Sequence, residues 1–280
     1  MTPPPAGAPR TGADTVFFLS DYGRTDEFVG VVHAVLRRLA PESLVIDLSH
    51  EVAPFSVEAG AQLLLRALPH LGRGVVLAVV DPGVGGARRG VVVEVAEGSG
   101  PTWFVGPDNG LLWPAIEAQG GAMRVIELAT PVDPGSATFD GRDLFAPAVA
   151  GLCRGEPASD LGPLVDPGSL VGLDLHQPSV QEGPDGRRRV RAGVTWVDRF
   201  GNAQLSTSGA LLPSSVTEVT VVAGAGASRP LRRVRAFAGL ARGEAGVLID
   251  ANGRLALVVR EGSAAAELGL GVGSEVEVVW

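Results

Sequence analysis

The chain has 280 residues, a hydrophobic content of 45% and a formal net charge of −8 at pH 7. This length allows one large domain or two ordinary ones, and the apolar fraction supports a full-sized core. An acidic balance with no offsetting basic stripe argues against a nucleic-acid partner. The single cysteine, Cys153, excludes both an intrachain disulfide and a cluster of thiolate metal ligands.

Residues 1–13 (MTPPPAGAPRTGA) lack the apolar core of a signal peptide, and we expect them to form a disordered tail. Further along, no apolar stretch reaches the length of a membrane span. These features together predict a cytoplasmic protein that makes no contact with a membrane.

Alternating strands and helices are predicted over residues 14–176. A helix is expected after Thr25, which is a candidate N-cap because Asp26 and Glu27 follow it in the first turn. A second helix is expected over 57–68, and a third after the turn PDNG. Short β-branched runs predict strands at 15–20, 44–48, 75–80, 90–95 and 102–106. This alternation predicts an α/β domain with a mostly parallel sheet flanked by helices.

The pattern changes near residue 175. Residues 177–189 are polar and rich in Gly and Pro, which predicts a linker. A series of short strands separated by turns then predicts a small antiparallel β domain over 190–280. The expected strands are 190–197, 203–207, 217–222, 245–249, 254–260 and 275–279.

An aspartate and an arginine stand seven residues apart in the turn VVDPGVGGARR, as Asp81 and Arg88. Asp81 follows a buried strand, and open α/β sheets hold their ligands at this edge of the strands. Pro82 and the glycines of the turn permit bends that would bring Arg88 back toward Asp81. The pair is therefore either a structural ion pair or part of a site.

Three further polar clusters occupy strand ends or turns. Their members are Asp21 and Asp26 in LSDYGRTDEF; Asp140, Arg142 and Asp143 in TFDGRDLFAP; and Asp198, Phe200 and Asn202 in WVDRFGN. Each has a simple structural alternative. Asp26 and Asp143 could cap helices, and the last cluster could be a hairpin turn.

Six motifs in order along the chain carry a family resemblance. They are SDYGRTDEFVG, DLSHEVAPFSVEAG, VVDPGVGGARR, VGPDNGLL, TFDGRDLFAPA and VDRFGN. Spanning roughly residues 15–275, the series resembles the S-adenosylmethionine hydrolases (hydroxide adenosyltransferases), relatives of the fluorinating and chlorinating adenosyl transferases. The resemblance implies an N-terminal α/β domain, a C-terminal β-barrel domain and a homotrimer. It also implies sites between one subunit's N-terminal domain and a neighbour's C-terminal domain.

The resemblance implies hydrolysis of S-adenosyl-L-methionine to adenosine and L-methionine, by in-line attack of water or hydroxide at the ribose 5′ carbon. Asp81, Arg88 and Asp140 match the set that positions the nucleophile. The substrate-binding positions that match are Asp21 for the ribose hydroxyls, Phe55 near the ribose, Asp26 and Asp198 near the methionine ammonium, and Asn202 at the adenine edge, with Phe200 in the same loop. We expect no metal and no cofactor, because histidines 33, 50, 70 and 176 form no ligand motif.

Two positions depart from the family pattern. Asp140 stands where the family has the histidine of TFHGRD, so either this carboxylate acts as a base or the loss of the imidazole blunts catalysis. In DANGR, Ala251 stands near a serine of the halogenating relatives, and Asp250 or Asn252 is the candidate substitute at the methionine end.

Two alternatives to hydrolysis remain. One is a non-catalytic protein that binds a nucleoside or S-adenosylmethionine. The other is a halide-dependent adenosyl transferase, which is disfavoured because Asp81 would repel a halide in a site of low dielectric. His50 matches a family histidine at the end of the second strand and is expected to tie down a loop. His33 is expected to be exposed or packed on its helix.

Overall fold

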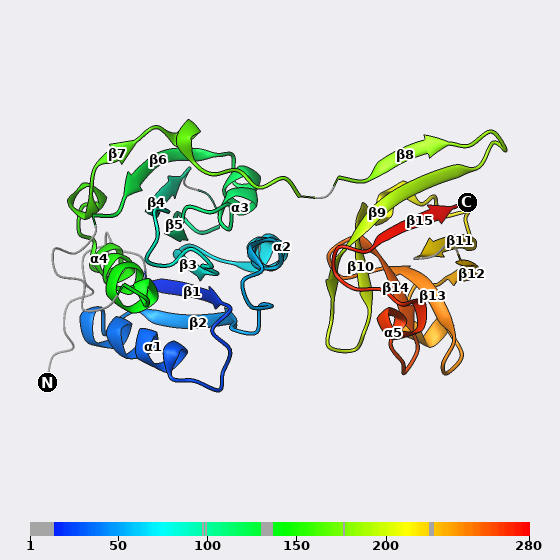
Figure 1. Cartoon of the computed structure of the whole chain (residues 1–280), viewed down its shortest axis with the longest axis horizontal. Helices are drawn as coiled ribbons and strands as arrows, with labels where there is room; N and C mark the ends of the chain where they lie inside the picture. Colours follow the sequence, from blue (N-terminus) through cyan, green and yellow to red (C-terminus); the bar gives the residue numbers. More distant parts are fainter. Residues whose placement is uncertain (1–13, 97, 99, 130–136, 176, 224–226) are drawn as a thin grey trace, which may run out of the picture. The chain divides into compact units, whose positions relative to one another are not determined.

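The computed structural model describes residues 14–96, 98, 100–129, 137–175, 177–223 and 227–280. The chain divides into two compact units, Met1–Leu173 and Asp174–Trp280 (Figure 1). The predicted tail, residues 1–13, lies outside the described residues. Each unit has its own core and is described here by itself.

The first unit is an α/β domain. Its helices and strands are β1 (Thr15–Ser20), α1 (Phe28–Leu39), β2 (Leu44–Ser49), α2 (Val57–Ala67), β3 (Val75–Val79), β4 (Gly90–Val95), β5 (Trp103–Pro107), α3 (Trp113–Ala118), β6 (Ala122–Glu127), α4 (Ala146–Arg154) and β7 (Leu164–Val165). In the described residues the strands form one seven-stranded sheet in the order β2-β1-β3-β5-β4-β6-β7. Strands β2, β1, β3 and β5 pair in parallel, and the rest of the sheet is antiparallel.

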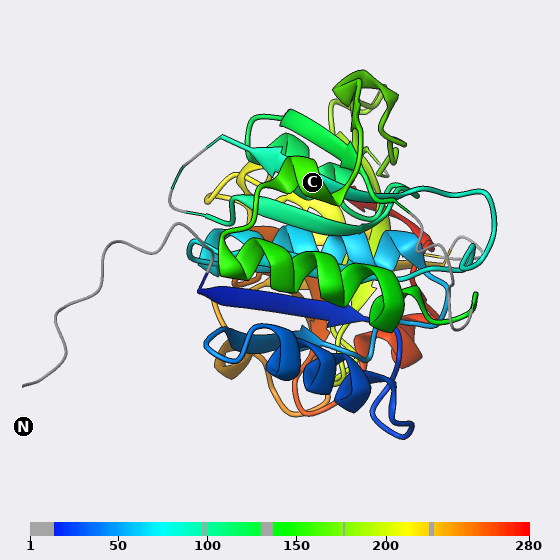
Figure 2. The ribbon, with the colours of Figure 1, turned by 90° about the vertical axis from the view of Figure 1, so that its left-hand side faces the viewer.

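Helices cover both faces of this sheet, which is why its central strands are almost continuously apolar. Along β1, Val16 and Phe18 pack with α1 and α4 on one face, and Phe17 and Leu19 pack with α2 and α3 on the other. Figures 1 and 2 show the two helix pairs on opposite sides of the sheet. All five residues of β3 are buried.

The first unit differs from the prediction at the start of α1 and in two strands. Helix α1 begins at Phe28, with Glu27 as N-cap and no capping side chain, so Thr25 is not the N-cap that we predicted. Residues 24–27 form an exposed bend instead. Strands β6 and β7 were not predicted, because Arg124 interrupts the apolar residues of β6 and β7 has only two residues.

The second unit is a β-barrel. Its strands and helix are β8 (Ser179–Glu182), β9 (Arg188–Val197), β10 (Ala203–Ser208), β11 (Glu218–Ala223), β12 (Ala227–Arg233), β13 (Ala245–Ile249), β14 (Arg254–Val259), α5 (Ala264–Leu268) and β15 (Glu275–Val279). Among the described residues, seven strands close a ring in the order β10-β14-β13-β12-β11-β15-β9, because β9 also pairs with β10. Every pairing is antiparallel except that of β12 with β13.

The stretch predicted as a linker, 177–189, contributes strands instead. β8 pairs with β9 as an antiparallel hairpin, with Val180 opposite Val190. Strand β15 pairs with the other edge of β9. Across this pairing, Glu277 on β15 forms ion pairs with Arg189 and Arg191 on β9. Cross-strand pairing of this kind stabilises polar strands that carry no hydrophobic pattern of their own.

No helix in the described part of the chain is long and apolar enough to cross a bilayer.

Candidate functional site

The first unit has a pocket at the carboxyl ends of its central parallel strands. Asp21 follows β1, and Asp81 comes two residues after the end of β3, its parallel neighbour, so both carboxylates reach the same edge of the sheet. The pocket has a volume of about 230 Å³. Its lining residues are Asp21, Tyr22, Phe28, Pro54, Phe55, Val79, Asp81, Val84, Thr138, Phe139, Asp140 and Gly141.

Arg88 joins the two carboxylates that the sequence singled out. Its Nε donates to Asp81 Oδ1 at 3.0 Å and to Oδ2 at 2.9 Å, and its terminal Nη2 donates to both Asp81 and Asp140. The side chains of Arg88, Asp81 and Asp140 are 13%, 6% and 19% exposed. One guanidinium therefore holds two largely buried carboxylates, 59 positions apart in the sequence as residues 81 and 140.

Two glycines allow the three segments of this site to approach so closely. Gly85 has φ of +73°, and a Cβ there would lie 2.3 Å from the carbonyl oxygen of Ala137, in the segment that leads to Asp140. A Cβ on Gly141 would lie 2.1 Å from the hydroxyl of Tyr22. Any larger residue at either position would push the turn that carries Arg88, or the tyrosine ring, away from the pocket.

Burial and the charges of the site shift the pKa values of two groups. Burial tends to lower the pKa of Arg88, but hydrogen bonds and charges from Asp81, and then from Asp140, outweigh it and raise that pKa. Burial also raises the pKa of the Tyr22 phenol, and the negative charges of Asp21, Asp81 and Asp140 raise it further. Arg88 is therefore a permanent cation, and Tyr22 remains a neutral hydrogen-bonding group.

Asp21 is oriented by the loop that carries Phe55. The backbone N–H of Phe55 donates to Asp21 Oδ2 at 2.9 Å, and Phe55 has φ of +66°, a conformation rare for a non-glycine residue. Within the described residues Asp21 Oδ1 has no hydrogen-bond partner. Because Phe55 is 73% exposed, its ring lies at the rim of the pocket rather than in the core.

Aromatic side chains that the sequence analysis did not single out form one wall of the pocket. Phe139 packs edge-on against Tyr22 and Phe28, with ring centroids 5.7 and 5.1 Å away. Tyr22 lies between the predicted Asp21 and Asp26 in SDYGRTDEF, so adjacency to a predicted residue was the available signal. No sequence spacing links Phe28 with Phe139, which meet only in the fold.

Two of the acidic residues in these motifs lie outside the pocket. Asp26 is in the exposed bend before α1 and is not among the residues that line the pocket. Asp143 accepts two hydrogen bonds from Arg142, each 2.7 Å long, so this carboxylate forms an ion pair rather than a helix cap.

The remaining predicted residues belong to a turn of the barrel. Asp198 Oδ1 accepts from the backbone N–H groups of Phe200 and Asn202, both at 2.9 Å, and Oδ2 accepts from the Asn202 side chain at 2.8 Å. Asp198 therefore stabilises a hairpin turn, which is the structural role that the sequence offered as the alternative to a binding role. The turn leaves Phe200 70% exposed.

This turn borders a second pocket, of about 970 Å³, within the barrel unit. Its lining includes Asp198, Phe200, Asn202, Asp250, Ala251 and Asn252, among others. Asp250 Oδ1 accepts from the backbone N–H of Asn252 at 2.8 Å, and Gln204 donates to Oδ2. Asp250 and Asn252, the predicted substitutes at the methionine end, therefore line the same pocket as Asn202. Asp250 also stabilises the turn in which it lies.

Two protein-family models match this chain. The model described as the SAM hydroxide adenosyltransferase N-terminal domain matches residues 16–162, and the model for the C-terminal domain of the same family matches residues 192–277. The chain belongs to the SAM hydroxide adenosyltransferase family. The match includes both units and every predicted site residue.

Two relatives named as hydrolases are similar to this chain over nearly their whole length. The "(R)-S-adenosyl-L-methionine hydrolase" of Salinispora tropica is 43% identical, over 94% of this chain and 97% of the relative. The protein with the same name from Thermus thermophilus is 40% identical, over 94% and 99%. A "Fluorinase" from an Actinoplanes species is more distant, at 27% identity over 69% of this chain and 72% of its own.

Among solved structures, an uncharacterized conserved protein from Thermotoga maritima has the same fold. It aligns with a TM-score of 0.83 and 33% sequence identity, over 94% of this chain and 99% of the other.

Proposed function

We propose that this chain hydrolyses S-adenosyl-L-methionine to adenosine and L-methionine. The support comes from the family, from relatives named for this hydrolase, and from one observation in the first unit. That observation is the pairing of Arg88 with both Asp81 and Asp140 in the pocket that also contains Asp21.

In the proposed reaction, a water molecule attacks the ribose 5′ carbon in line with the departing sulfur. A C–O bond forms, the C–S bond breaks, and its electron pair passes to sulfur, which leaves as the neutral thioether of methionine. The proton of the water passes to a carboxylate of the Asp81–Asp140 pair and then to solvent. The attack neutralises a sulfonium cation, so a partly dry pocket favours it and no redox cofactor is required.

The roles proposed for the other residues follow from their hydrogen-bonding capacity. Asp21 would accept from the two ribose hydroxyls, since a carboxylate accepts several hydrogen bonds and Oδ1 faces no other described partner. Phe55 would pack near the ribose, and Asn202 would bind the adenine edge, with Phe200 beside it. Asp26 and Asp198 are proposed near the methionine ammonium. For Asp198 this role must coexist with the three hydrogen bonds that hold its turn.

A non-catalytic binding protein is the second candidate, and the residue at position 140 favours it specifically. Asp140 stands where the family has a histidine, and no imidazole is among the described residues that line this pocket. A protein that retains the nucleoside pocket without turnover would bind S-adenosylmethionine or adenosine and release no product.

Product analysis separates the candidates. The purified chain is incubated with S-adenosyl-L-methionine in water labelled with the heavy isotope of oxygen, with and without chloride, and the nucleosides are resolved by chromatography and mass spectrometry. We expect adenosine carrying the label in its 5′ hydroxyl, in both conditions. A 5′-chloro nucleoside would instead identify the halide-dependent reaction. Binding without any nucleoside product would identify the non-catalytic protein.

We also propose that the chain works as a homotrimer in the cytoplasm. The trimer, with each site completed by a second copy of the chain, rests on the family resemblance, and the compartment rests on the sequence. Light scattering of the purified chain tests the first, since a mass of three chains is expected. A fully active monomer would exclude it.

A further inference from the structure

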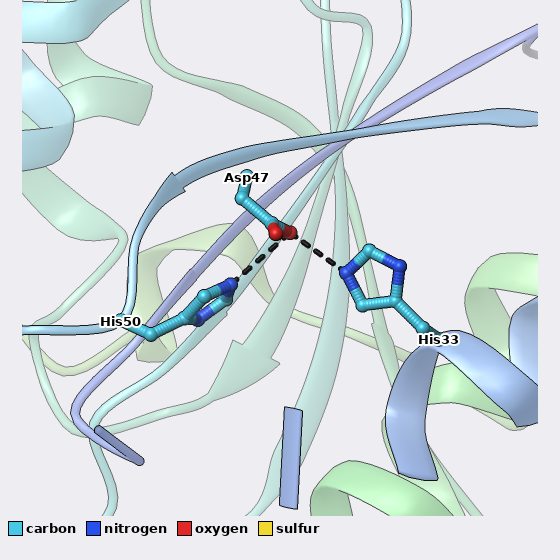
Figure 3. Close-up of side chains that lie close together, drawn as sticks. All are labelled: His33, Asp47 and His50. Carbon is cyan, nitrogen blue, oxygen red and sulfur yellow. Dashed lines mark hydrogen bonds and ion pairs between the residues drawn. The ribbon is translucent and has the colours of Figure 1, made fainter. Parts of the chain in front are cut away.

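Two histidines and an aspartate meet on the face of the first unit that α1 covers. His33 lies on α1, Asp47 on β2, and His50 directly follows β2 (Figure 3). His33 Nε2 is 2.8 Å from Asp47 Oδ1, and His50 Nε2 is 3.1 Å from the same oxygen. One donor atom from each residue lies within 4.8 Å of the others. The sequence shows no ligand motif here, because the second half of α1 and all of β2 separate the two histidines.

The fold places these side chains by packing rather than by local spacing. Strand β2 is the parallel neighbour of β1, and Phe18 of β1 contributes a ring that touches both imidazoles. Its centroid is 4.5 Å from that of His50 and 6.0 Å from that of His33. The buried Phe18 ring therefore packs against both imidazoles of the cluster.

His50 is pre-oriented, and one of its nitrogens is available. Its side chain is 1% exposed, and Nδ1 lies 2.7 Å from the hydroxyl oxygen of Ser20. The other nitrogen, Nε2, is buried and has no hydrogen bond to the described residues, although Asp47 is close. The Ser20 contact accounts for one ring nitrogen, which is the usual arrangement behind a metal-ligating histidine. With the proton held on Nδ1 by this contact, Nε2 would be the metal-binding nitrogen, 3.1 Å from Asp47 Oδ1.

We propose that His33, Asp47 and His50 bind a divalent transition-metal ion of the Zn²⁺ type. Two imidazole nitrogens and one carboxylate oxygen are donors that Zn²⁺ accepts, whereas Mg²⁺ and Ca²⁺ prefer oxygen alone. The His33 and Asp47 side chains are 36% and 32% exposed, so the ion can enter from solvent and water can complete its coordination.

The spacing suits the proposed ion after a small adjustment. Tetrahedral Zn²⁺ with bonds of about 2.1 Å separates its ligand atoms by about 3.4 Å. The two separations to Asp47 Oδ1, 2.8 and 3.1 Å, would open toward this value, and the two imidazole nitrogens, which lie within 4.8 Å of each other, would take the same spacing. The His33 side chain is only partly buried, so it can supply most of this movement without disturbing the buried His50.

The bound ion would act on the loop of the candidate site. Ser20, which contacts His50, directly precedes Asp21, and the backbone N–H of Gly23 donates to the His50 carbonyl at 2.7 Å. An ion that fixes His50 therefore braces residues 20–23 and links them to α1 and β2. This proposal is independent of the proposed hydrolysis, since it concerns no reacting atom.

The test is a calorimetric titration of the untagged, chelator-treated full chain with Zn²⁺. We expect one Zn²⁺ per chain, with affinity at least about 10-fold weaker in His33→Ala and in Asp47→Asn. Co²⁺ as a second probe should give tetrahedral visible absorption in the parent and lose it in His33→Ala. Saturating Zn²⁺ should also raise the melting temperature of the parent by about 5–10 °C.

His70→Ala is the matched control, because His70 is exposed and far from the cluster in sequence. It should bind Zn²⁺ like the parent. His50→Ala is avoided, since removing a buried side chain can unfold the unit, and circular dichroism verifies that the other variants are folded. Absence of stoichiometric Zn²⁺ binding by the parent would overturn the proposal, and the cluster would then be a hydrogen-bonded one only. Parent-like binding by His33→Ala, or weakened binding by His70→Ala, would overturn it equally.

Discussion

Replacing Arg88 by alanine is expected to destabilise the first unit strongly. The guanidinium is 13% exposed and is shared by carboxylates that are 6% and 19% exposed. Removing one partner of a buried ion pair costs about 3–5 kcal/mol, because it leaves buried charge without compensation. Here two carboxylates lose their cation, and Arg88 also packs 5.4 Å from the ring centre of Phe145. We therefore expect a loss of about 3–5 kcal/mol at neutral pH.

Thermal unfolding followed by circular dichroism measures this loss. For a unit of this size the expected decrease in melting temperature is about 6–20 °C. Hydrogen exchange then locates the effect, since peptides from β1 and β3 should lose protection while those from the barrel should not. Arg124→Ala is the matched control. Arg124 pairs with Glu94 but is 53% exposed, so its loss should cost less than about 1 kcal/mol.

A melting temperature of Arg88→Ala within about two degrees of that of Arg124→Ala would contradict this expectation. Such a result would mean that water solvates Asp81 and Asp140 well enough to replace the guanidinium.

Three further predictions concern single residues of the same pocket. Asp140→Ala should lower the turnover of S-adenosylmethionine at least about 10-fold, and Asp140→His should keep or raise it; parent-like turnover by a folded Asp140→Ala would make Asp140 a bystander. Asp21→Ala should weaken adenosine binding by about 10–150-fold, measured by calorimetry, because a charge-assisted hydrogen bond is worth about 1.5–3 kcal/mol; unchanged affinity would remove Asp21 from the ribose site. Tyr22 is the single tyrosine of the chain, so tyrosinate absorbance reports it alone. Its raised pKa means that the folded protein should titrate well above the unfolded one, and that stability should decrease as the pH rises through the unfolded value of 10.0. Equal midpoints in the folded and denatured protein would show an exposed phenol.

The sequence predicted most elements of the fold because their signals are local. β1 and β3 are short apolar runs that end in a polar residue or a turn, and the structure has them within a residue of the expected bounds. Asp21, Asp81, Arg88 and Asp140 were predicted from motifs at strand ends or in turns, and the structure places all four close together.

What the sequence could not supply depends on contacts between distant segments. β8 has no hydrophobic pattern and exists because β9 pairs with it. His33 and His50 were treated as unrelated side chains, yet the packing of α1 over the first two strands brings both to Asp47. The prediction that Thr25 caps α1 was wrong for a related reason. The helix starts at Phe28, which contacts Tyr22 and Phe139, and not directly after the residue with the best local capping signal.

The closure of the barrel has a consequence for the order in which the chain folds during synthesis. The strands of the first unit are complete once β7, at residues 164 and 165, has been made, so that unit can fold while the ribosome is still extending the chain. The barrel has no such early stage, because β15 lies between β11 and β9 and is made after both. Until residues 275–279 emerge, β9 and β11 present two open edges, which are able to pair with another nascent chain. A truncation before residue 275 would make that exposure permanent and would convert a closed barrel into an aggregation-prone open sheet.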